Sequence, residues 1–146
     1  ALHSALGTVA PGRPGDPAAR LMAPAAGTLD LADVPDRLAE HGYRTMELCH
    51  FHVPDRSPAA LAELRARREA AGVELWSLLV DDGDVSDPEH GERDREWVRG
   101  WIADAAALGA RRVRVIAGKQ PPSPDALARS VAALRSLSAE AEALGV

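Results

Sequence analysis

The chain of 146 residues holds one cysteine, Cys49, and one lysine, Lys119. A single cysteine cannot form a disulfide within the chain, and a lone thiol is typical of a protein from a reducing compartment. No apolar run approaches the roughly 20 residues of a membrane-spanning helix, so we expect no membrane partner. The first residues lack a charged segment followed by an apolar one, so we expect no secretory signal and a cytoplasmic protein.

The sequence also lacks a basic surface. The formal net charge is −5, and the arginines of the predicted helices stand among acids. Nucleic-acid binding needs a basic patch, so we expect no nucleic-acid partner. Two nucleotide-binding motifs are missing as well, GxGxxG after the first strand and GxxxxGK followed by Ser or Thr. Apolar residues make up 46% of the chain, which is enough to build a core.

What the sequence does contain is a repeat. Four predicted helices each end in glycine, at Gly42, Gly72, Gly109 and Gly145, about 30–37 residues apart. Glycine suits the left-handed position just past a helix. These helices begin at residues 33, 57, 87 and 123, where Ser or Asp stands close before Pro. Each repeat therefore has the length of one strand plus one helix.

Apolar runs between the helices predict strands at residues 2–10, 43–51, 73–80 and 111–117, and residues 11–27 read as a long loop after the first strand. Alternating strands and helices predict an α/β protein with a parallel βαβ repeat. A doubly wound sheet and a (βα)8 barrel both fit. A barrel needs about 250 residues, so residues 1–146 would be a single partial domain of about four βα units.

Three segments carry a resemblance to a known family: GYRTMELCHFHVP, AGVELWSLLVDDGDVSDP and ERDREWVRGWIADAAALGARRVRVIAG. They resemble the sugar phosphate isomerase/epimerase group of the xylose isomerase-like TIM barrels, over about residues 30–146. The resemblance implies that the chain is the N-terminal half of a (βα)8 TIM barrel. It also implies an enzyme that moves a proton next to the carbonyl of a sugar, sugar phosphate or related polyol.

Most proteins of this family hold a divalent metal at the C-terminal face of the barrel. The resemblance therefore implies Mn²⁺, Mg²⁺, Zn²⁺ or Co²⁺ as cofactor of the full-length enzyme. The family's usual ligands lie on the fifth and later strands, so they would fall beyond residue 146. No metal ligand and no catalytic residue is assigned within this chain.

The first candidate site residues belong to the second predicted strand. Glu47 lies within it, and a carboxylate in a buried strand needs a partner, for which Arg114 is the obvious choice. His50 and His52 follow at its carboxyl end, on the same side if the chain remains extended. Imidazole suits contact with sugar hydroxyls and proton transfer. We predict substrate binding by all three; a structural ion pair for Glu47 and chance loop positions for the histidines remain open.

The third and fourth strands supply the other candidates. Asp81 directly follows the third strand, where it could bind a sugar hydroxyl. Arg114 lies within the fourth strand, and a buried guanidinium needs a carboxylate or phosphate. We predict substrate binding for both. Asp84 and Asp87 are predicted to shape the next loop and to cap the following helix.

Two other functional readings remain open. One is a different reaction of the same superfamily, an endonuclease IV-like hydrolase or an inosose-type dehydratase. The other is a non-catalytic half-barrel that associates with another chain, since its two edge strands would lack partners. A sugar-like small molecule is the expected partner, and a homo-oligomer is a further prediction.

Overall fold

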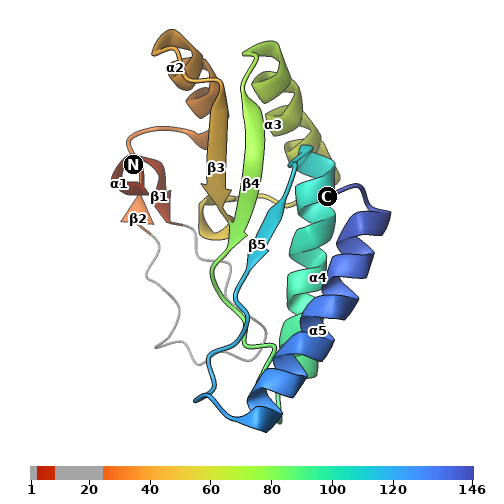
Figure 1. The fold of residues 1–146 in the computed structure, drawn as a ribbon. Helices are drawn as coiled ribbons and strands as arrows, with labels where there is room; N and C mark the ends of the chain where they lie inside the picture. The colour runs from red at the N-terminus through yellow and green to blue at the C-terminus, as the bar shows by residue number, and fades with distance from the viewer. Residues whose placement is uncertain (1–2, 9–24) are drawn as a thin grey trace.

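The computed structural model describes residues 3–8 and 25–146, and its arrangement is shown in Figure 1. In chain order the elements are α1 (His3–Leu6), β1 (Gly7–Thr8), β2 (Ala25–Ala26), the 3-10 turn η2 (Leu31–Asp33), α2 (Val34–Glu40), β3 (Thr45–Cys49), the 3-10 turn η3 (His50–His52), α3 (Pro58–Ala70), β4 (Glu74–Val80), α4 (Gly91–Leu108), β5 (Val113–Val115) and α5 (Pro124–Ala143). Strands and helices alternate from α2 onward, as the repeat predicts.

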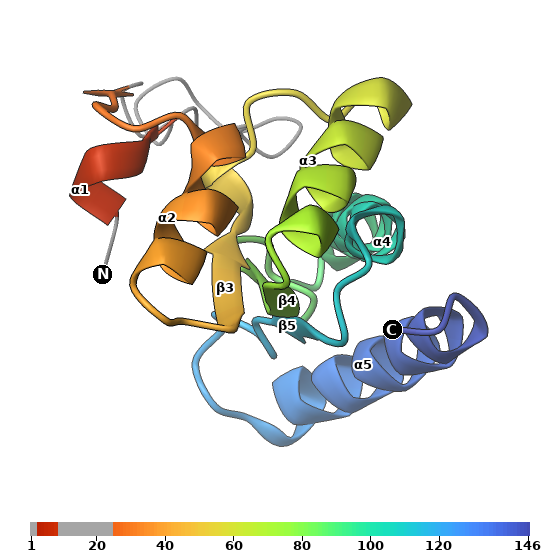
Figure 2. The same ribbon diagram turned by 90° about the horizontal axis from the view of Figure 1, so that it is seen from above.

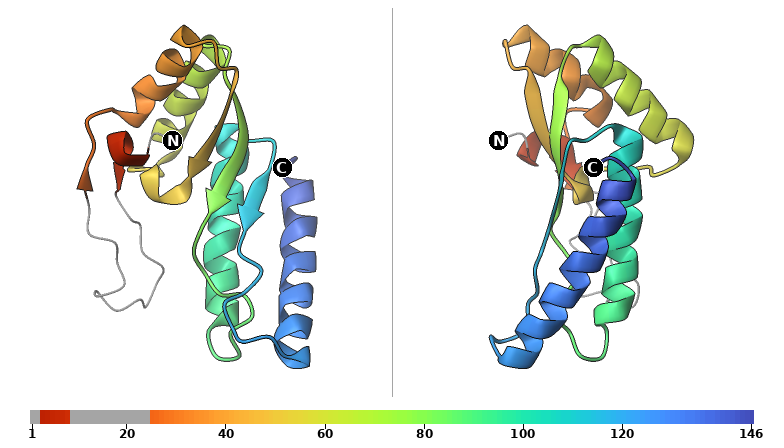
Figure 3. Two further views of the ribbon diagram at one scale, coloured as in Figure 1. Left: turned by 60° about the vertical axis from the view of Figure 1, so that its left-hand side comes forward. Right: turned by 45° about the vertical axis from the view of Figure 1, so that its right-hand side comes forward.

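The main sheet has three strands in the order β3-β4-β5, and both pairings are parallel. The helices follow one another around one side of this sheet, as the view from above shows (Figure 2). The opposite face of the sheet carries no helix among the described residues (Figure 3). We call this uncovered side the inner face, because it would face the centre of a closed barrel. The arrangement confirms the predicted half of a (βα)8 barrel.

The core lies between the sheet and its helices. Strand β4 is central, and Leu75, Leu78 and Val80 are at most 2% exposed. From α4, Trp97 and Trp101 pack with their rings edge to face, 6.1 Å between centroids. Trp101 has no exposed surface, and truncating such a side chain costs about 3–5 kcal/mol. Trp97 and Trp101 are therefore packing residues.

Helix ends follow the predicted signals in most places. Ser57 Oγ accepts a hydrogen bond from Ala60 N at 3.3 Å, and Ser123 Oγ accepts one from Ala126 N at 3.1 Å. Gly109 ends α4 in the left-handed conformation with φ 69°, a backbone shape that glycine adopts without steric cost. These contacts confirm the Ser-Pro starts of α3 and α5 and the glycine stop of α4.

The start of α2 differs from the prediction. Asp33 makes no side-chain cap; instead Asp30 Oδ1 accepts from Ala32 N at 2.9 Å and caps the 3-10 turn η2. A capping side chain needs an extended backbone, whereas Asp33 already has helical φ −89° and ψ −11°. The turn before the helix moves the cap three residues upstream.

The predicted first strand is wrong for its described part. Residues 3–6 form α1, and only Gly7 and Thr8 form a strand, which pairs antiparallel with β2 outside the main sheet. The described segment HSALGT has a single β-branched residue, which favours a helical turn over a long strand. Residues 9–10 of that prediction, and residues 11–24 of the predicted loop, lie outside the described residues; the loop's residues 25–26 form β2.

Two predicted strands are shorter than expected. β3 ends at Cys49, and the chain turns at once into η3, so His50 and His52 do not continue an extended strand. β5 covers three residues, although Arg111 and Arg112 directly before it still form backbone hydrogen bonds with β4. No described helix combines the length and the apolarity needed to cross a membrane. The predicted association with another chain stays a prediction.

Candidate functional site

The strands β3, β4 and β5 run parallel, so their carboxyl ends meet at one edge of the sheet. In barrel enzymes this edge carries the active site. Directly after the strands come η3, the acidic loop at residues 81–90 and the loop at residues 116–123. The candidate site is this edge together with the adjoining inner face.

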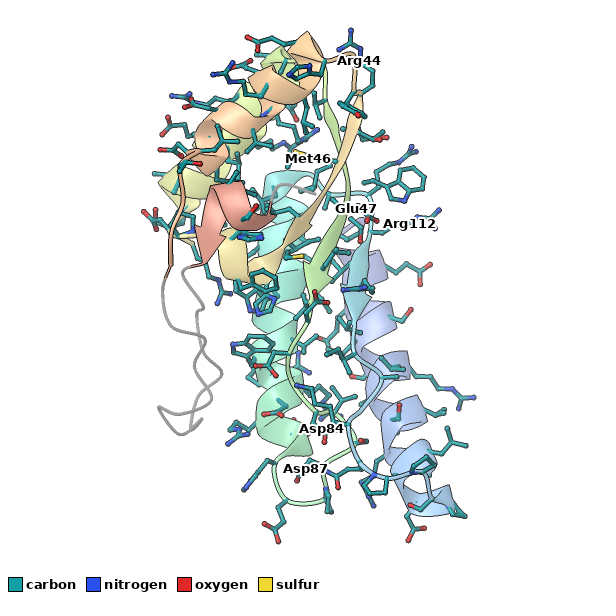
Figure 4. The ribbon with its side chains drawn as sticks, turned by 90° about the vertical axis from the view of Figure 1, so that its left-hand side faces the viewer. Arg44, Met46, Glu47, Asp84, Asp87 and Arg112 are labelled. Atoms are coloured by element: carbon teal, nitrogen blue, oxygen red, sulfur yellow. The ribbon has the colours of Figure 1, made fainter. Side chains whose placement is uncertain are left out.

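The strand register decides which side chains reach the inner face. Cys49 of β3 pairs with Leu79 of β4, which pairs with Arg114 of β5. One row earlier, Glu47 pairs with Ser77. Figure 4 shows Met46 pointing toward the helices and Glu47 pointing to the opposite side, where Arg112 also points. The predicted site residues Glu47 and Arg114 thus share the inner face.

Asp81 is the centre of the cluster at the edge. Its Oδ1 accepts a hydrogen bond and ion pair from Arg114 Nη2. The thiol of Cys49 lies beside the same carboxylate, whose charge acts on it. Burial, and after it the charge of Asp81, raises the pKa of Cys49 to about 11. The thiol therefore stays protonated at neutral pH and adds no second negative charge beside Asp81.

The expected pairing of Glu47 with Arg114 is wrong. Arg114 pairs with Asp81, and its side chain is 57% exposed rather than buried. Glu47 lies exposed on the inner face, two residues before Cys49. The expectation failed because both residues were taken to be buried, whereas the face that they share is open in this chain.

His50 supports Asp81 from behind the sheet edge. The residue is 4% exposed, and its Nδ1 lies 3.2 Å from Asp81 N, which donates, and 3.3 Å from Leu79 O. The edges of Trp97 and Trp101 surround the ring at centroid distances of 5.4 and 5.3 Å. Burial lowers the pKa of His50 below its ordinary value, so the ring is neutral at pH 7. A substrate contact by His50 stays a prediction.

His52 lies apart from this cluster. It is 5% exposed, and its Nδ1 donates to the carbonyl oxygen of Gly7 at 2.5 Å. This bond ties η3 to β1, since a carbonyl can only accept. The structure thus brings Glu47, His50, Asp81 and Arg114 to one region, and it places His52 on the link to β1.

A second ion pair at the same edge was not predicted from the sequence. Lys119 Nζ lies 2.5 Å from Asp82 Oδ1 and joins the loops that follow β4 and β5. The available signal was the position of Lys119 directly after a strand and a glycine, opposite an acidic loop.

Asp84 fastens the two loops together. Its carboxylate is buried and accepts from Ser86 N at 3.1 Å, Ser86 Oγ at 2.7 Å, Lys119 N at 2.9 Å and Gln120 Nε2 at 2.8 Å. Burial opposes its ionisation, but these hydrogen bonds outweigh burial and lower the pKa of Asp84. The loop-shaping role predicted for Asp84 is confirmed.

The neighbouring contacts complete the fastening of the loops. Asp87 Oδ1 accepts from Glu89 N and His90 N at 2.8 and 2.7 Å. It therefore caps the turn before α4 and not the helix itself, which begins at Gly91 instead of the predicted position 87. Figure 4 shows Asp84 and Asp87 together in the loop beyond the sheet edge. Gly118 fits closely against Ser86, since a Cβ on this glycine would lie 2.3 Å from Ser86 Oγ. The two loops are therefore tied together beside the Asp81 cluster.

The described residues do not fit a complete metal site. Within residues 3–8 and 25–146, no three side chains of His, Cys, Asp or Glu converge in a way that could hold an ion. Asp81 is engaged with Arg114, and His50 is buried behind it. The Asp81 cluster can offer hydrogen-bond donors and acceptors to a ligand.

Fold and edge cluster together define part of a parallel (βα)8 barrel whose polar groups gather at the carboxyl ends of the strands. The chain belongs to the xylose isomerase-like TIM barrel family, whose model matches residues 35–146. This confirms the family indicated by the sequence resemblance. A comparison with curated proteins gives no match.

Several solved structures share the fold. A D-psicose 3-epimerase from Clostridium cellulolyticum H10, solved with D-tagatose, has a TM-score of 0.68 and 18% identity, over 81% of this chain and 45% of its own. A D-psicose 3-epimerase solved in the presence of D-fructose has a TM-score of 0.65 and 16% identity, and the match covers 82% of this chain and 45% of its own. A xylose isomerase domain protein from Planctomyces limnophilus has a TM-score of 0.63 and 16% identity, and the match covers 76% of this chain and 46% of its own. The chain spans a little under half the length of these proteins.

Proposed function

We propose that the chain is the N-terminal half of a cytoplasmic, metal-dependent isomerase or epimerase that acts on a sugar, sugar phosphate or related polyol. The proposal rests chiefly on the Asp81–Arg114 pair, held at the carboxyl edge of a half-barrel of the xylose isomerase-like family. The metal would be Mn²⁺, Mg²⁺, Zn²⁺ or Co²⁺, with ligands beyond residue 146. Similarity to two D-psicose 3-epimerases supports the choice of a sugar.

In this proposal the described residues bind and orient the substrate. The carboxylate of Asp81 accepts from one sugar hydroxyl, and Arg114 donates to a neighbouring oxygen with the N–H groups that its ion pair leaves over. His50 holds the backbone of Asp81, whose N–H donates to the imidazole Nδ1, and the neutral thiol of Cys49 lies beside the carboxylate. Glu47 lies deeper on the inner face, as a second acceptor. Proton abstraction next to the carbonyl belongs to a base outside this half.

The test uses the protein at its full natural length, with D-fructose and D-psicose in deuterated water and each of the four metals in turn. An isomerase or epimerase incorporates solvent deuterium next to the carbonyl, or forms a new sugar, and NMR detects both. Asp81→Asn should lower kcat/KM about 10- to 100-fold, since a hydrogen bond to a charged group contributes about 1.5–3 kcal/mol. Asp36→Asn, an exposed substitution on α2, is the matched control. Absence of exchange and of product with every metal would overturn the proposal.

A further inference from the structure

Two ion pairs stand at the edge where a substrate would enter. Asp81 pairs with Arg114, and Asp82 pairs with Lys119; each pair joins the loop after β4 to the β5 segment. All four side chains are partly exposed, between 31% and 57%. They are therefore accessible to a ligand while each charge already has its counter-ion.

We call the inner face of β3, β4 and β5, together with its carboxyl edge, the wall. Its negative and positive side chains are equal in number. The acids on the inner face and edge are Glu47, Glu74, Asp81 and Asp82, and the cations are Arg111, Arg112, Arg114 and Lys119. Figure 4 shows Glu47 and Arg112 pointing to the same side. Asp84 adds no outward charge, because it is buried and its carboxylate is taken up by the loops. An anionic group would meet a surface without net positive charge.

The alternation of acceptors and donors suits a different ligand group. A hydroxyl donates one hydrogen bond and accepts others. A carboxylate beside a guanidinium or ammonium offers one partner of each kind within a few ångströms. Neighbouring hydroxyls of a sugar can therefore bind across one ion pair without separating its charges. A phosphate would have to displace the carboxylate from its cation, which costs part of an existing interaction.

We propose that the wall formed by β3, β4 and β5 recognises uncharged hydroxyl groups, so that the substrate is a free sugar and not a phosphorylated or carboxylated one. The inference rests on the proposed function and narrows its substrate class to sugars without a phosphate or carboxylate group. Asp81 is the main acceptor of this wall, and the Asp82–Lys119 pair sets its charge balance.

The experiment compares D-fructose with D-fructose 6-phosphate as ligands of the full-length protein, by calorimetry for binding and by NMR for conversion. The wild-type protein should bind the free sugar at least about 10-fold more tightly. Asp82→Asn frees Lys119 from its counter-ion and leaves the Asp81 cluster intact. It should improve binding of the phosphate ester about 3- to 10-fold, as expected for one charge at the surface. Asp36→Asn makes the same charge change on α2 and should leave both affinities unchanged.

The outcomes separate the two proposals. If the wild-type protein binds and converts the phosphate ester in preference to the free sugar, the enzyme class holds and the inference about its substrate is wrong. An unchanged phosphate affinity in Asp82→Asn also refutes the inference, because the charge balance would then have no effect. If neither sugar is bound or converted, both proposals fail.

Discussion

Replacing Asp84 with alanine tests whether the two loops at the sheet edge form one unit. The substitution removes the acceptor of four hydrogen bonds, which come from Ser86 N and Oγ, Lys119 N and Gln120 Nε2. The donors are partly or fully buried, so they lose their partner without full access to water. A net loss of about 1 kcal/mol for each bond gives about 3–5 kcal/mol in the free energy of unfolding.

Urea unfolding followed by tryptophan fluorescence measures this loss. For a chain of this length it corresponds to a decrease in Tm of roughly 6–20 °C, at about 2–4 °C per kcal/mol. Asp84→Asn keeps the shape and one acceptor oxygen, so it should lose roughly half as much. Glu89→Ala, an exposed change in the same loop, is the control and should stay within about 0.5 kcal/mol of the wild type. If Asp84→Ala lowers the free energy of unfolding no more than the control does, Asp84 does not hold the two loops together.

Three further predictions concern the same edge. Gly118→Ala should cost about 2–4 kcal/mol, because the new Cβ would lie 2.7 Å from Ser86 Cβ at φ 153°; Gly118→Ala combined with Ser86→Gly should recover part of the loss, and strict additivity would contradict the contact. Burial lowers the pKa of His50, so its contribution to stability is complete above the unfolded-state pKa of about 6.5 and decreases as the pH falls below it. Urea midpoints between pH 7.5 and 5 measure this slope, and His50→Gln should flatten it. Cys49, with its pKa raised to about 11 by burial and by Asp81, should react with a thiol reagent at pH 8 on the order of 100-fold more slowly than in the unfolded chain; similar rates in both states would show that the thiol is not held.

Much of the fold could be predicted from the sequence because local signals and the tertiary structure agree. Gly109 stops α4, Ser57 and Ser123 cap their helices, and the buried run of β4 stands where the apolar residues are. The prediction failed where distant contacts decide. His52 turns away from the strand to meet Gly7, which lies 45 positions earlier in the chain. No short pattern around His52 carries that information.

The site shows the same division. Position alone placed Asp81 just after the third predicted strand and Arg114 within the neighbouring fourth strand, and the structure joins them. The partner of Lys119 could not be predicted, because the loop after β4 holds several acids of similar spacing. Which acid meets which cation depends on the fold of that loop. Asp84 fixes the fold by turning inward and binding the backbone of Lys119, which leaves Asp82 for the ammonium group.

A β-bulge in strand β4 places Asp81 on the inner face of the sheet. The ladder between β3 and β4 shifts by one residue between Met46 and Glu47, so that Trp76 has no partner in β3. Without the extra residue, Cys49 would lie opposite Leu78 instead of Leu79 and the apolar sets of the two strands would face opposite sides. With it, Leu78 faces the helices while Asp81, two residues after Leu79, comes out on the inner face. The run VELWSLLV shows this in its spacing, since the buried leucines 75 and 78 are three apart rather than two. The bulge therefore belongs to the candidate site as much as the residues that it orients.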